Sequence, residues 1–393
     1  MRGTCRRPNA LLLLILGLCL LHGPAQAEAK DSYRLERVVV VMRHGIRPPT
    51  KAQPVPAEIA AGPWPTWDVG WGELSHHGEQ AITRLAEFDA GSYATFAGCN
   101  ARVIADVDQR TLRTAEVYAA TLFKGCGTAI EHVAMDQVDP RFSPFEGDTA
   151  ADGEAQLKVA QGALPAGGLA AVDAAQRVRL QTLTKLIGCT TAVCDLAAQP
   201  TEFVVAKGRV KIDGGIDIGS TLAQVMLLQY ADGKPLSDVG WGRADEATIA
   251  DLSALHAAEF ALVARPKAIA AFGARPLLAE VKRGLFATDT AKFTLLVGHD
   301  SNLAYLGGVF GVHWKAGDLA QDDPAPGGAL IFEKWRNAKG HEVVIVRYRA
   351  QTLDEMRNLT PLTASAAEAL SLPFCGGRTA CTAGQFLDEL NAD

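Results

Sequence analysis

Residues Leu35 to Thr50 read LERVVVVMRHGIRPPT. The run from Val38 to Met42 is entirely apolar and rich in β-branched residues, which is typical of a strand buried on both faces of a sheet. A polar Arg-His-Gly turn ends that run. Because open α/β sheets bind ligands beyond the carboxyl ends of their strands, the stretch predicts a central strand with a functional site at its end.

Other segments of the chain share this strand character or show helical periodicity. We expect strands at Arg102–Ala105, Phe293–Val297 and Glu342–Tyr348, and helices at Gln80–Phe88, Thr111–Leu122, Leu222–Tyr230 and Thr248–Val263. This alternation predicts an α/β sheet. Residues 144–272 are instead rich in alanine, leucine and glutamine at helical spacing. We therefore predict an α/β domain made of residues 28–143 and 273–393, with a smaller, mainly α-helical domain inserted at 144–272.

The amino terminus has the pattern of an export signal. Arg2, Arg6 and Arg7 precede an uncharged run from Ala10 to Leu21, and Ala25-Gln26-Ala27 offers small residues for cleavage. The run is about 12 residues long, which is short of the roughly 20 needed to cross a bilayer. We predict a signal peptide at residues 1–27 and a periplasmic or secreted protein that is not held in a membrane after cleavage.

Cysteine usage agrees with export. Loss of residues 1–27 leaves six cysteines, namely Cys99, Cys126, Cys189, Cys194, Cys375 and Cys381. An even number in an exported chain favours disulfides, and clustering makes local pairing the simplest scheme, although six cysteines allow fifteen connectivities. No Cys/His spacing typical of a zinc site is present, and we expect neither a metal nor an organic cofactor.

The charge of the chain restricts its partners. The formal net charge is −6, and it becomes −9 once the three arginines of the signal are removed. This leaves no general basic surface for nucleic acid, so any affinity for anions must be local. No feature of the sequence calls for an oligomer, and we expect a monomer.

The turn after the first strand carries the chemistry. Arg43 and Arg47 flank His44, and Gly45 allows the backbone to approach a ligand closely. Guanidinium groups match phosphate oxygens as paired donors, so two of them beside an imidazole describe a phosphate pocket with a nucleophile at its floor.

A second strand end completes this chemistry. Phe293–Val297 leads into Gly298-His299-Asp300-Ser301-Asn302, which alone would be an ordinary helix start, since Asp and Ser favour that position. Together with the first motif, His299 supplies another phosphate donor and Asp300 an acid that protonates the departing alkoxide. Asp300 must carry a proton for this step, which predicts operation in acid.

The two motifs resemble those of the histidine acid phosphatases, RHGxRxP near the mature start and HD near the end. They stand here as Arg43-His44-Gly45-Ile46-Arg47-Pro48 and His299-Asp300. The resemblance is closest to bacterial periplasmic phytases. It extends to Pro63–Trp67, Asp106–Thr111, Gly240–Arg243, Pro326–Gly328 and Glu333–Trp335.

The resemblance implies a role for each site residue. It makes His44 the nucleophile, Asp300 the proton donor, and Arg43, Arg47, Arg110 and His299 the groups that cradle phosphate. Arg110 also has a physical argument, because it stands at the start of a predicted helix, whose amino end favours anions. The implied fold is a Rossmann-like α/β domain with a smaller α-helical domain and the substrate cleft between them, and the local disulfide scheme agrees with that branch.

Substrate preference rests on fewer residues. Thr50 and Lys51 resemble the phytase branch and favour myo-inositol hexakisphosphate, whereas Ser301 resembles the sugar-phosphatase variant and Gln224 stands where either branch has an acid. We predict an acid phosphomonoesterase, a phytase, that acts through a phosphohistidine. The alternatives are a sugar phosphatase resembling glucose-1-phosphatase and, outside enzymes, a phosphate-binding protein, which would need the arginines but not Asp300.

Overall fold

A mixed sheet carries the chain's central strands in the computed structural model, which describes residues 32–146 and 152–392. Within those residues the strand order is β10-β8-β7-β1-β6-β2-β3, and β9 pairs with β8. The strands of this sheet are β1 (Tyr33–Arg43), β2 (Ala101–Ala105), β3 (Ile130–Glu131), β6 (Phe293–Gly298), β7 (Ala329–Asn337), β8 (Glu342–Arg349), β9 (Ala367–Ala369) and β10 (Ala380–Thr382). The strands that the sequence predicts are all present.

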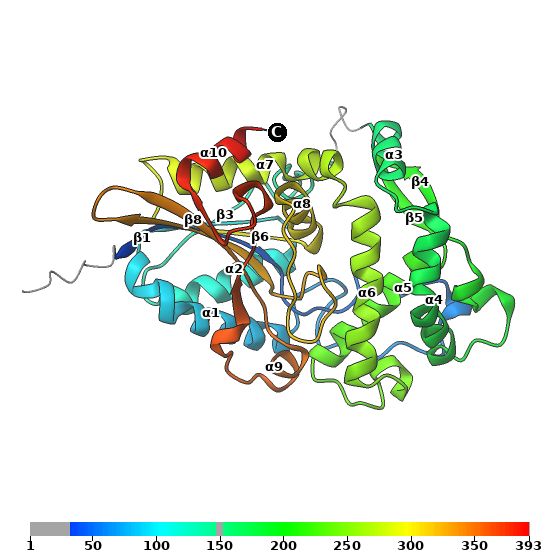
Figure 1. Ribbon diagram of the computed structural model, residues 1–393. Coiled ribbons are helices and arrows are strands. Elements are labelled where there is room, and N and C mark those ends of the chain that lie inside the picture. Colours follow the sequence, from blue (N-terminus) through cyan, green and yellow to red (C-terminus); the bar gives the residue numbers. More distant parts are fainter. Residues whose placement is uncertain (1–31, 147–151, 393) are drawn as a thin grey trace, which may run out of the picture. The chain divides into compact units, whose positions relative to one another are not determined.

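Helices cover both faces of the sheet, with α1 and α2 on one face and α7 and α10 on the other (Figure 1). The side chains of β1 alternate accordingly. Val38 and Val40 belong to the hydrophobic cluster that includes α1 and α2 residues, whereas Val39 and Val41 belong to the cluster that includes α7 and α8 residues. The helices of this part are α1 (His76–Ala97), α2 (Gln109–Leu122), α7 (Lys267–Phe286), α8 (Asp300–Phe310), α9 (Leu353–Asn358) and α10 (Ala383–Asn391). The mixed α/β class is therefore confirmed.

The segment between β3 and α7 is largely helical. Its long helices are α3 (Gly153–Gly162), α4 (Gly168–Leu186), α5 (Gly215–Ala231) and α6 (Glu246–Val263). The segment also contains the short 3-10 helices η2 (Ala192–Cys194), η3 (Leu196–Ala198) and η4 (Val239–Gly242). Outside it, 3-10 helices occur at η1 (Ala57–Ile59), η5 (Ala364–Ala366) and η6 (Pro373–Cys375). Helix α7 runs across the predicted boundary at residues 272 and 273. The division into two domains stays a prediction.

A β-hairpin lies within this helical segment and was not expected from the sequence. Its strands are β4 (Glu202–Ala206) and β5 (Arg209–Asp213), paired antiparallel. The connecting residues Lys207 and Gly208 both have positive φ, 50° and 73°. Two such residues form the tight turn whose twist matches that of a hairpin, so the turn fixes which residues of β5 face each side.

Three neighbouring strands run parallel and end at one edge of the sheet. β1 pairs with β6 so that Arg43 lies opposite Gly298, and β6 pairs with β2 so that Val297 lies opposite Ala105. The residues that follow these strands are therefore brought together at the carboxyl edge, as the sequence predicts.

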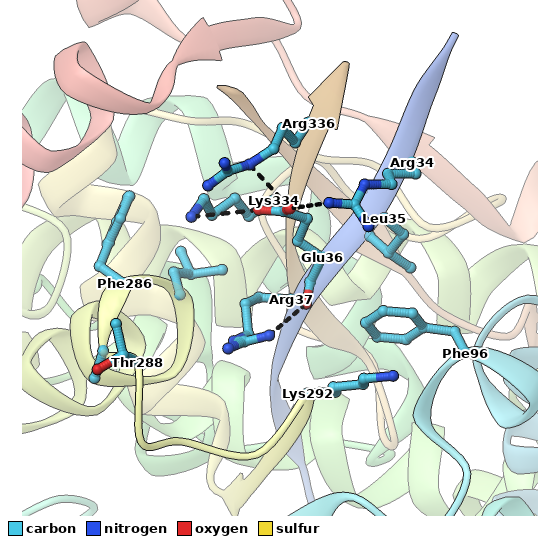
Figure 2. A pocket seen from close by; sticks show the side chains of 12 residues that line it. Arg34, Leu35, Glu36, Arg37, Phe96, Phe286, Thr288, Lys292, Lys334 and Arg336 are labelled. Atoms are coloured by element: carbon cyan, nitrogen blue, oxygen red, sulfur yellow. Dashed lines mark hydrogen bonds and ion pairs between the residues drawn. The ribbon is translucent and has the colours of Figure 1, made fainter. Parts of the chain in front are cut away.

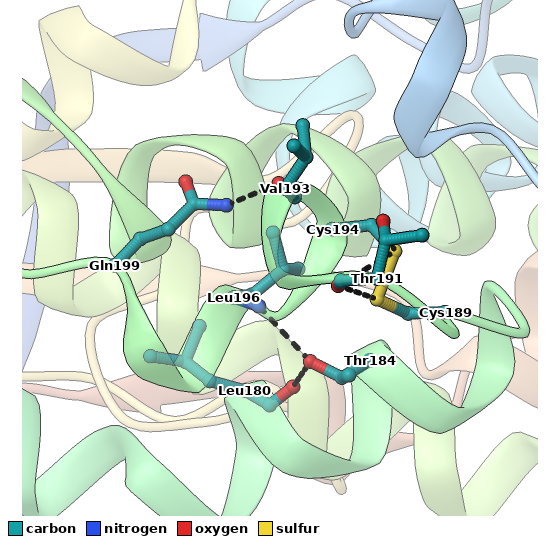
Figure 3. Close-up of a disulfide and its surroundings, with 8 residues drawn as sticks. All are labelled: Leu180, Thr184, Cys189, Thr191, Val193, Cys194, Leu196 and Gln199. Atoms are coloured by element: carbon teal, nitrogen blue, oxygen red, sulfur yellow. Dashed lines mark hydrogen bonds between the residues drawn. A yellow bond between two sulfur atoms is a disulfide. The ribbon is translucent and has the colours of Figure 1, made fainter.

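Three disulfides join Cys99 to Cys126, Cys189 to Cys194 and Cys375 to Cys381. These are the local pairs that the spacing of the cysteines favours. Figure 3 shows the Cys189–Cys194 bond and the nearby contact that ties its loop to α4. There the Leu196 N–H donates to Thr184 Oγ1 at 3.1 Å, and that hydroxyl donates to the Leu180 carbonyl at 2.8 Å.

The predicted signal peptide at residues 1–27 lies outside the described residues. Among the residues that the structure describes, no single helix combines the length and apolar composition of a membrane span. Only α6 and α7 taken together reach that threshold, and a bend of 93° separates them.

Candidate active site

The predicted site residues gather in a cavity of about 420 Å³ at the carboxyl edge of β1, β6 and β2. His44 directly follows β1, and His299 and Asp300 follow β6. Arg110 lies in the first turn of α2, which comes soon after β2. Five of the six catalytic and phosphate-binding candidates line this cavity, namely His44, Arg47, Arg110, His299 and Asp300. The sixth, Arg43, lines an adjoining cavity that Asp300 also lines.

His44 is held with one ring nitrogen free to act. Its backbone N–H donates to the Gly298 carbonyl at 2.9 Å, which fixes it to β6. Its Nδ1 lies 2.9 Å from the Gly45 carbonyl, and a carbonyl only accepts, so Nδ1 carries the proton. In this tautomer Nε2 has a lone pair, and Arg47 Nε approaches it at 3.4 Å.

The surroundings keep His44 neutral. The side chain is buried, with an exposure of 1%. Burial lowers the pKa of His44 well below its usual value, and the charges of Arg47, Arg110 and Arg43 lower it further. A nucleophilic nitrogen must be unprotonated, so this histidine stays available in acid, where an ordinary imidazole would be charged.

Arg43 is a rigid cation at the back of the site. Its guanidinium donates to the Pro324 carbonyl and, through Nη2, to Gln224 Oε1 at 3.0 Å. The same Nη2 lies 3.1 Å from Asp300 Oδ2. These contacts hold the guanidinium between the nucleophile's strand and the predicted proton donor.

Arg47 and Arg110 complete the group of cations. Arg47 Nη1 donates to the Pro48 carbonyl at 2.9 Å, and Arg110 Nη2 pairs with Asp108 at 2.6 Å. Burial, together with the charges of Arg110 and Arg43, lowers the pKa of Arg47 to about 9, so it remains charged in acid. The buried Arg110 Nε has no hydrogen-bond partner among the described residues. A cluster of like charges with spare donors is a site prepared for an anion.

His299 is oriented by a carboxylate that sequence reasoning did not single out. Its Nε2 lies 2.7 Å from Asp106 Oδ2, and its backbone N–H donates to Asn302 Oδ1 at 2.8 Å. The ring meets that of His44 edge to face, with centroids 5.7 Å apart. Asp106 directly follows β2, at the strand-end position that the sheet geometry makes functional.

Asp300 is the first residue of α8, and it faces mostly cations. Burial raises its pKa, but the positive charges of Arg43, His256, Arg47 and His299 together lower it by more than burial raises it. The net pKa therefore lies below its usual range. Without substrate the carboxyl is therefore ionised in mild acid. The proton that the sequence assigns to it must arrive when an anionic ligand takes up the arginine charge.

His256 on α6 is a further member of the site, and the sequence did not indicate it. Its Nδ1 lies 2.5 Å from Asp323 Oδ1, and its Nε2 lies 3.9 Å from Asp300 Oδ2. Burial lowers the pKa of His256, but Asp323 and Asp300 together raise it by more, so the net pKa is above its usual value. The loop that holds His256 through Asp323 also holds Arg43 through the next residue, Pro324.

Thr50 and Lys51, the predicted specificity residues, are exposed at the rim of the cleft. They line a cavity of about 290 Å³ that also contacts Arg43, Gln224 and Asp300. Gln224 occupies the position where an acid was expected, and its oxygen accepts from Arg43. Because Gln224 is neutral, it does not offset the positive charge of Arg43 on the side of the cleft that Thr50 and Lys51 line.

One group of side chains has the composition of a metal site. Asp106, Asp108 and His299 place ligand atoms within 4.8 Å of one another. The Arg110 guanidinium already contacts Asp108, however, and a ring proton of His299 is directed at Asp106. We therefore interpret these carboxylates as acceptors that position Arg110 and His299, and we assign no metal to them.

A separate cavity of about 430 Å³ lies at the opposite end of β1, and Figure 2 shows its lining. Glu36 pairs there with Arg34, Lys334 and Arg336, at 3.2, 3.7 and 2.9 Å. Its lining contains no histidine, so it offers no nucleophile of the kind that His44 provides. It does not compete with the cavity at His44 as a site for phosphate chemistry.

Comparisons with known proteins agree with this geometry. Residues 34–163 match the model of the histidine phosphatase superfamily (branch 2). The chain is 31% identical to the phytase AppA of Escherichia coli (strain K12), over 98% of each chain. It is 27% identical to the glucose-1-phosphatase of Providencia rettgeri, over 88% of this chain and 89% of that one. The Hafnia alvei phytase solved in complex with myo-inositol hexakis sulphate has a TM-score of 0.82 at 28% identity, covering 92% of this chain and 97% of that one. The chain belongs to the histidine phosphatase superfamily, branch 2, and it is a phosphatase.

Proposed function

We propose that this phosphatase is an exported phytase that works in acid through a phosphohistidine on His44. The observation that carries the proposal is the neutral, buried imidazole of His44, whose free Nε2 lies among three guanidinium groups. An imidazole without a proton is a nucleophile, and the surrounding cations both bind phosphate and offset the charge that spreads over its oxygens during transfer. The export signal at residues 1–27 and the three disulfides support a periplasmic or secreted location.

The first step transfers the phosphoryl group to the enzyme. His44 Nε2 forms a bond to phosphorus while the bond between phosphorus and the ester oxygen breaks. Asp300 gives its proton to that oxygen, which leaves as an alcohol. A phosphate monoester has a second pKa of about 6, so in acid it carries a proton of its own, which passes to Asp300 as the substrate binds.

The second step returns the enzyme to its starting state. Asp300, now a carboxylate, takes a proton from a water molecule, whose oxygen forms a bond to phosphorus. The bond between phosphorus and His44 Nε2 breaks, and phosphate leaves with the proton that Asp300 had taken, so that the carboxyl is ionised again. Arg43, Arg47, Arg110 and His299 hold the phosphoryl oxygens through both steps.

The cleft supports a polyphosphorylated substrate. The cavity at His44 is joined by two others, of about 340 and 290 Å³, and Asp300 lines all three. The space therefore continues on more than one side of the reacting group, as a ligand with several phosphates requires. The likeness to the E. coli and Hafnia alvei phytases supports the same choice.

A sugar phosphatase resembling glucose-1-phosphatase is the second candidate. Ser301, which lines the cleft, favours it, as does the likeness to the Providencia rettgeri enzyme. Such an enzyme would share every chemical step and differ only in how it binds the leaving group.

Phosphate release from phytate and from glucose 1-phosphate, measured in mild acid, separates the two. We expect a higher kcat/KM for phytate, and we expect His44→Ala to abolish release from both esters. A preference for the sugar ester would assign the second candidate. Release that persists in His44→Ala would refute the proposed nucleophile.

A further inference from the structure

The hairpin strand β5 carries two cations that the chemistry at His44 does not use. Arg209 and Lys211 are two residues apart on one strand, so their side chains leave the same face. Between and beyond them Val210 and Ile212 are buried and point to the core. Arg209 lines the cavity at His44, and both cations line the adjoining cavity of about 340 Å³.

Neither cation has a carboxylate within ion-pair distance among the described residues. Within residues 32–146 and 152–392, no ion pair or side-chain hydrogen bond engages Arg209 or Lys211, although both are half-buried. Burial lowers the pKa of Lys211, and the charges of Arg209 and Lys207 lower it further. Keeping two partly buried cations side by side without a carboxylate in direct contact is unfavourable, which indicates a position kept for an anionic ligand.

The hairpin is held firmly in place. Gln156 of α3 is buried, and its Oε1 accepts from the Val210 N–H at 3.2 Å while its Nε2 donates to the Gly208 carbonyl at 3.0 Å. These two bonds bracket Arg209 in the chain. Gly153 lets α3 approach closely, because a Cβ there would lie 2.4 Å from Val205 Cγ1. The cations therefore project from a rigid strand and not from a mobile loop.

The two acids that act on Lys211, Asp217 and Glu259, contact neither cation, and the charge of Asp217 is largely lost in mild acid. Glu259 accepts a hydrogen bond from the Ser220 hydroxyl at 2.5 Å. Burial raises the pKa of Asp217 to about 6, and the charges of Glu259 and Asp213 contribute to the rise. In mild acid Asp217 is thus largely neutral, and the cavity gains positive character under the conditions where the enzyme is expected to work.

We propose that Arg209 and Lys211 form a second phosphate-binding site, which holds a phosphate of a polyphosphorylated substrate other than the phosphate that His44 attacks. This inference rests on the proposed function, since only a substrate with several phosphates reaches both sites. Asp300, Ser301 and Tyr305 line both cavities and separate the two phosphates. A substrate with one phosphate leaves the second site unused.

Competition by myo-inositol hexasulfate against hydrolysis of p-nitrophenyl phosphate tests the inference without requiring phytate turnover. The proteins compared are the wild type and two double variants, in which Arg209 and Lys211 are both changed to Ala or both changed to Gln. Each lost charged contact weakens binding by roughly tenfold or more. We expect the inhibition constant to rise at least about tenfold more than the KM for the monoester does.

Lys207→Asn is the matched control, because it removes a charge from the same hairpin at an exposed turn where asparagine tolerates the positive φ. We expect this variant to behave as wild type. Equal inhibition constants for the control and both double variants would overturn the inference, and so would a wild type that hexasulfate does not inhibit. If the double variants lose inhibition but wild type fails to hydrolyse phytate, the second site stands and the proposed substrate does not.

Discussion

Replacing His256 by asparagine is expected to move the pH dependence of the reaction. His256 Nε2 lies 3.9 Å from Asp300 Oδ2, and its pairing with Asp323 keeps the imidazole charged. Loss of this cation makes the carboxylate form of Asp300 less favourable, so the pKa of Asp300 rises. Because Asp300 must be protonated to act as the acid, the alkaline limb of kcat moves to higher pH.

The size of the shift follows from the distance. Two unit charges 3.9 Å apart interact by about 4 kcal/mol at an effective dielectric constant of about 20, which corresponds to about 3 pKa units. The Asp300 side chain is 22% exposed, and solvent screens part of this interaction. We therefore expect the limb to move by about 1 to 2 pH units.

The measurement is kcat for phosphate release from 2-glycerophosphate across the acid and neutral range, because its alkoxide leaves only with a proton from Asp300. Asp323→Asn should shift the limb in the same direction by a smaller amount, because it retains the imidazole but removes the anion that keeps it charged. His313→Asn is the control, since His313 also pairs with an aspartate, Asp322, but is exposed and lines none of the cavities at Asp300. Superimposable profiles for wild type and His256→Asn would refute the reasoning.

Three further predictions concern stability. Asp89→Asn leaves the buried Arg349, which lies 2.8 Å from Asp89, without its counter-ion, and it should lower the free energy of unfolding in urea by about 3–5 kcal/mol; a loss below about 1 kcal/mol would contradict this. Asp217 has a raised pKa of about 6, so its contribution to stability is complete in acid and is lost as the pH rises through that value. Asp217→Asn should therefore gain stability relative to wild type as the pH rises from acid to neutral, by about 1 kcal/mol in the free energy of unfolding after allowance for partial exposure. Thermal unfolding at the two pH values measures this gain, and a difference between variant and wild type that does not change with pH would count against the raised pKa of Asp217. Changing Cys99 and Cys126 together to serine opens a loop closed at a sequence separation of 27 and should cost about 3–4 kcal/mol, whereas an unchanged urea midpoint would show that this bridge does not stabilise the fold.

The fold and the reacting groups were predictable because their sequence signals are local. The apolar run Val38–Met42 and the segment Phe293–Val297 are unbroken, and each ends in a polar turn, so both the strands and the edge where they end can be inferred. Parallel pairing of β1 with β6 then brings His44 and His299 together, although 255 residues separate them along the chain. The mixed α/β class and the three local disulfides were confirmed in the same way.

The residues that tune the site left no such signal. His256 lies within an apolar helix, where a single histidine looks like any core residue, and Asp323 lies in a loop far along the chain. Their partnership exists only in three dimensions. The β4–β5 hairpin did have a signal, alternation around Lys207-Gly208 in TEFVVAKGRVKID, but it is short and lies in a segment dominated by helical spacing. The domain boundaries and the residue roles taken from the family resemblance stay predictions.

The central claim, a covalent phosphohistidine on His44, is tested most directly with Asp300→Asn and p-nitrophenyl phosphate. The nitrophenolate leaves without needing a proton, so the first step proceeds, whereas the second step lacks the carboxylate that activates water and the phosphoenzyme accumulates. We predict a burst of about one equivalent of nitrophenol per enzyme, with the phosphoryl group found on His44 by mass spectrometry after an alkaline quench. Absence of a burst together with no phosphorylated His44, or a phosphoryl group on another residue, would contradict the account.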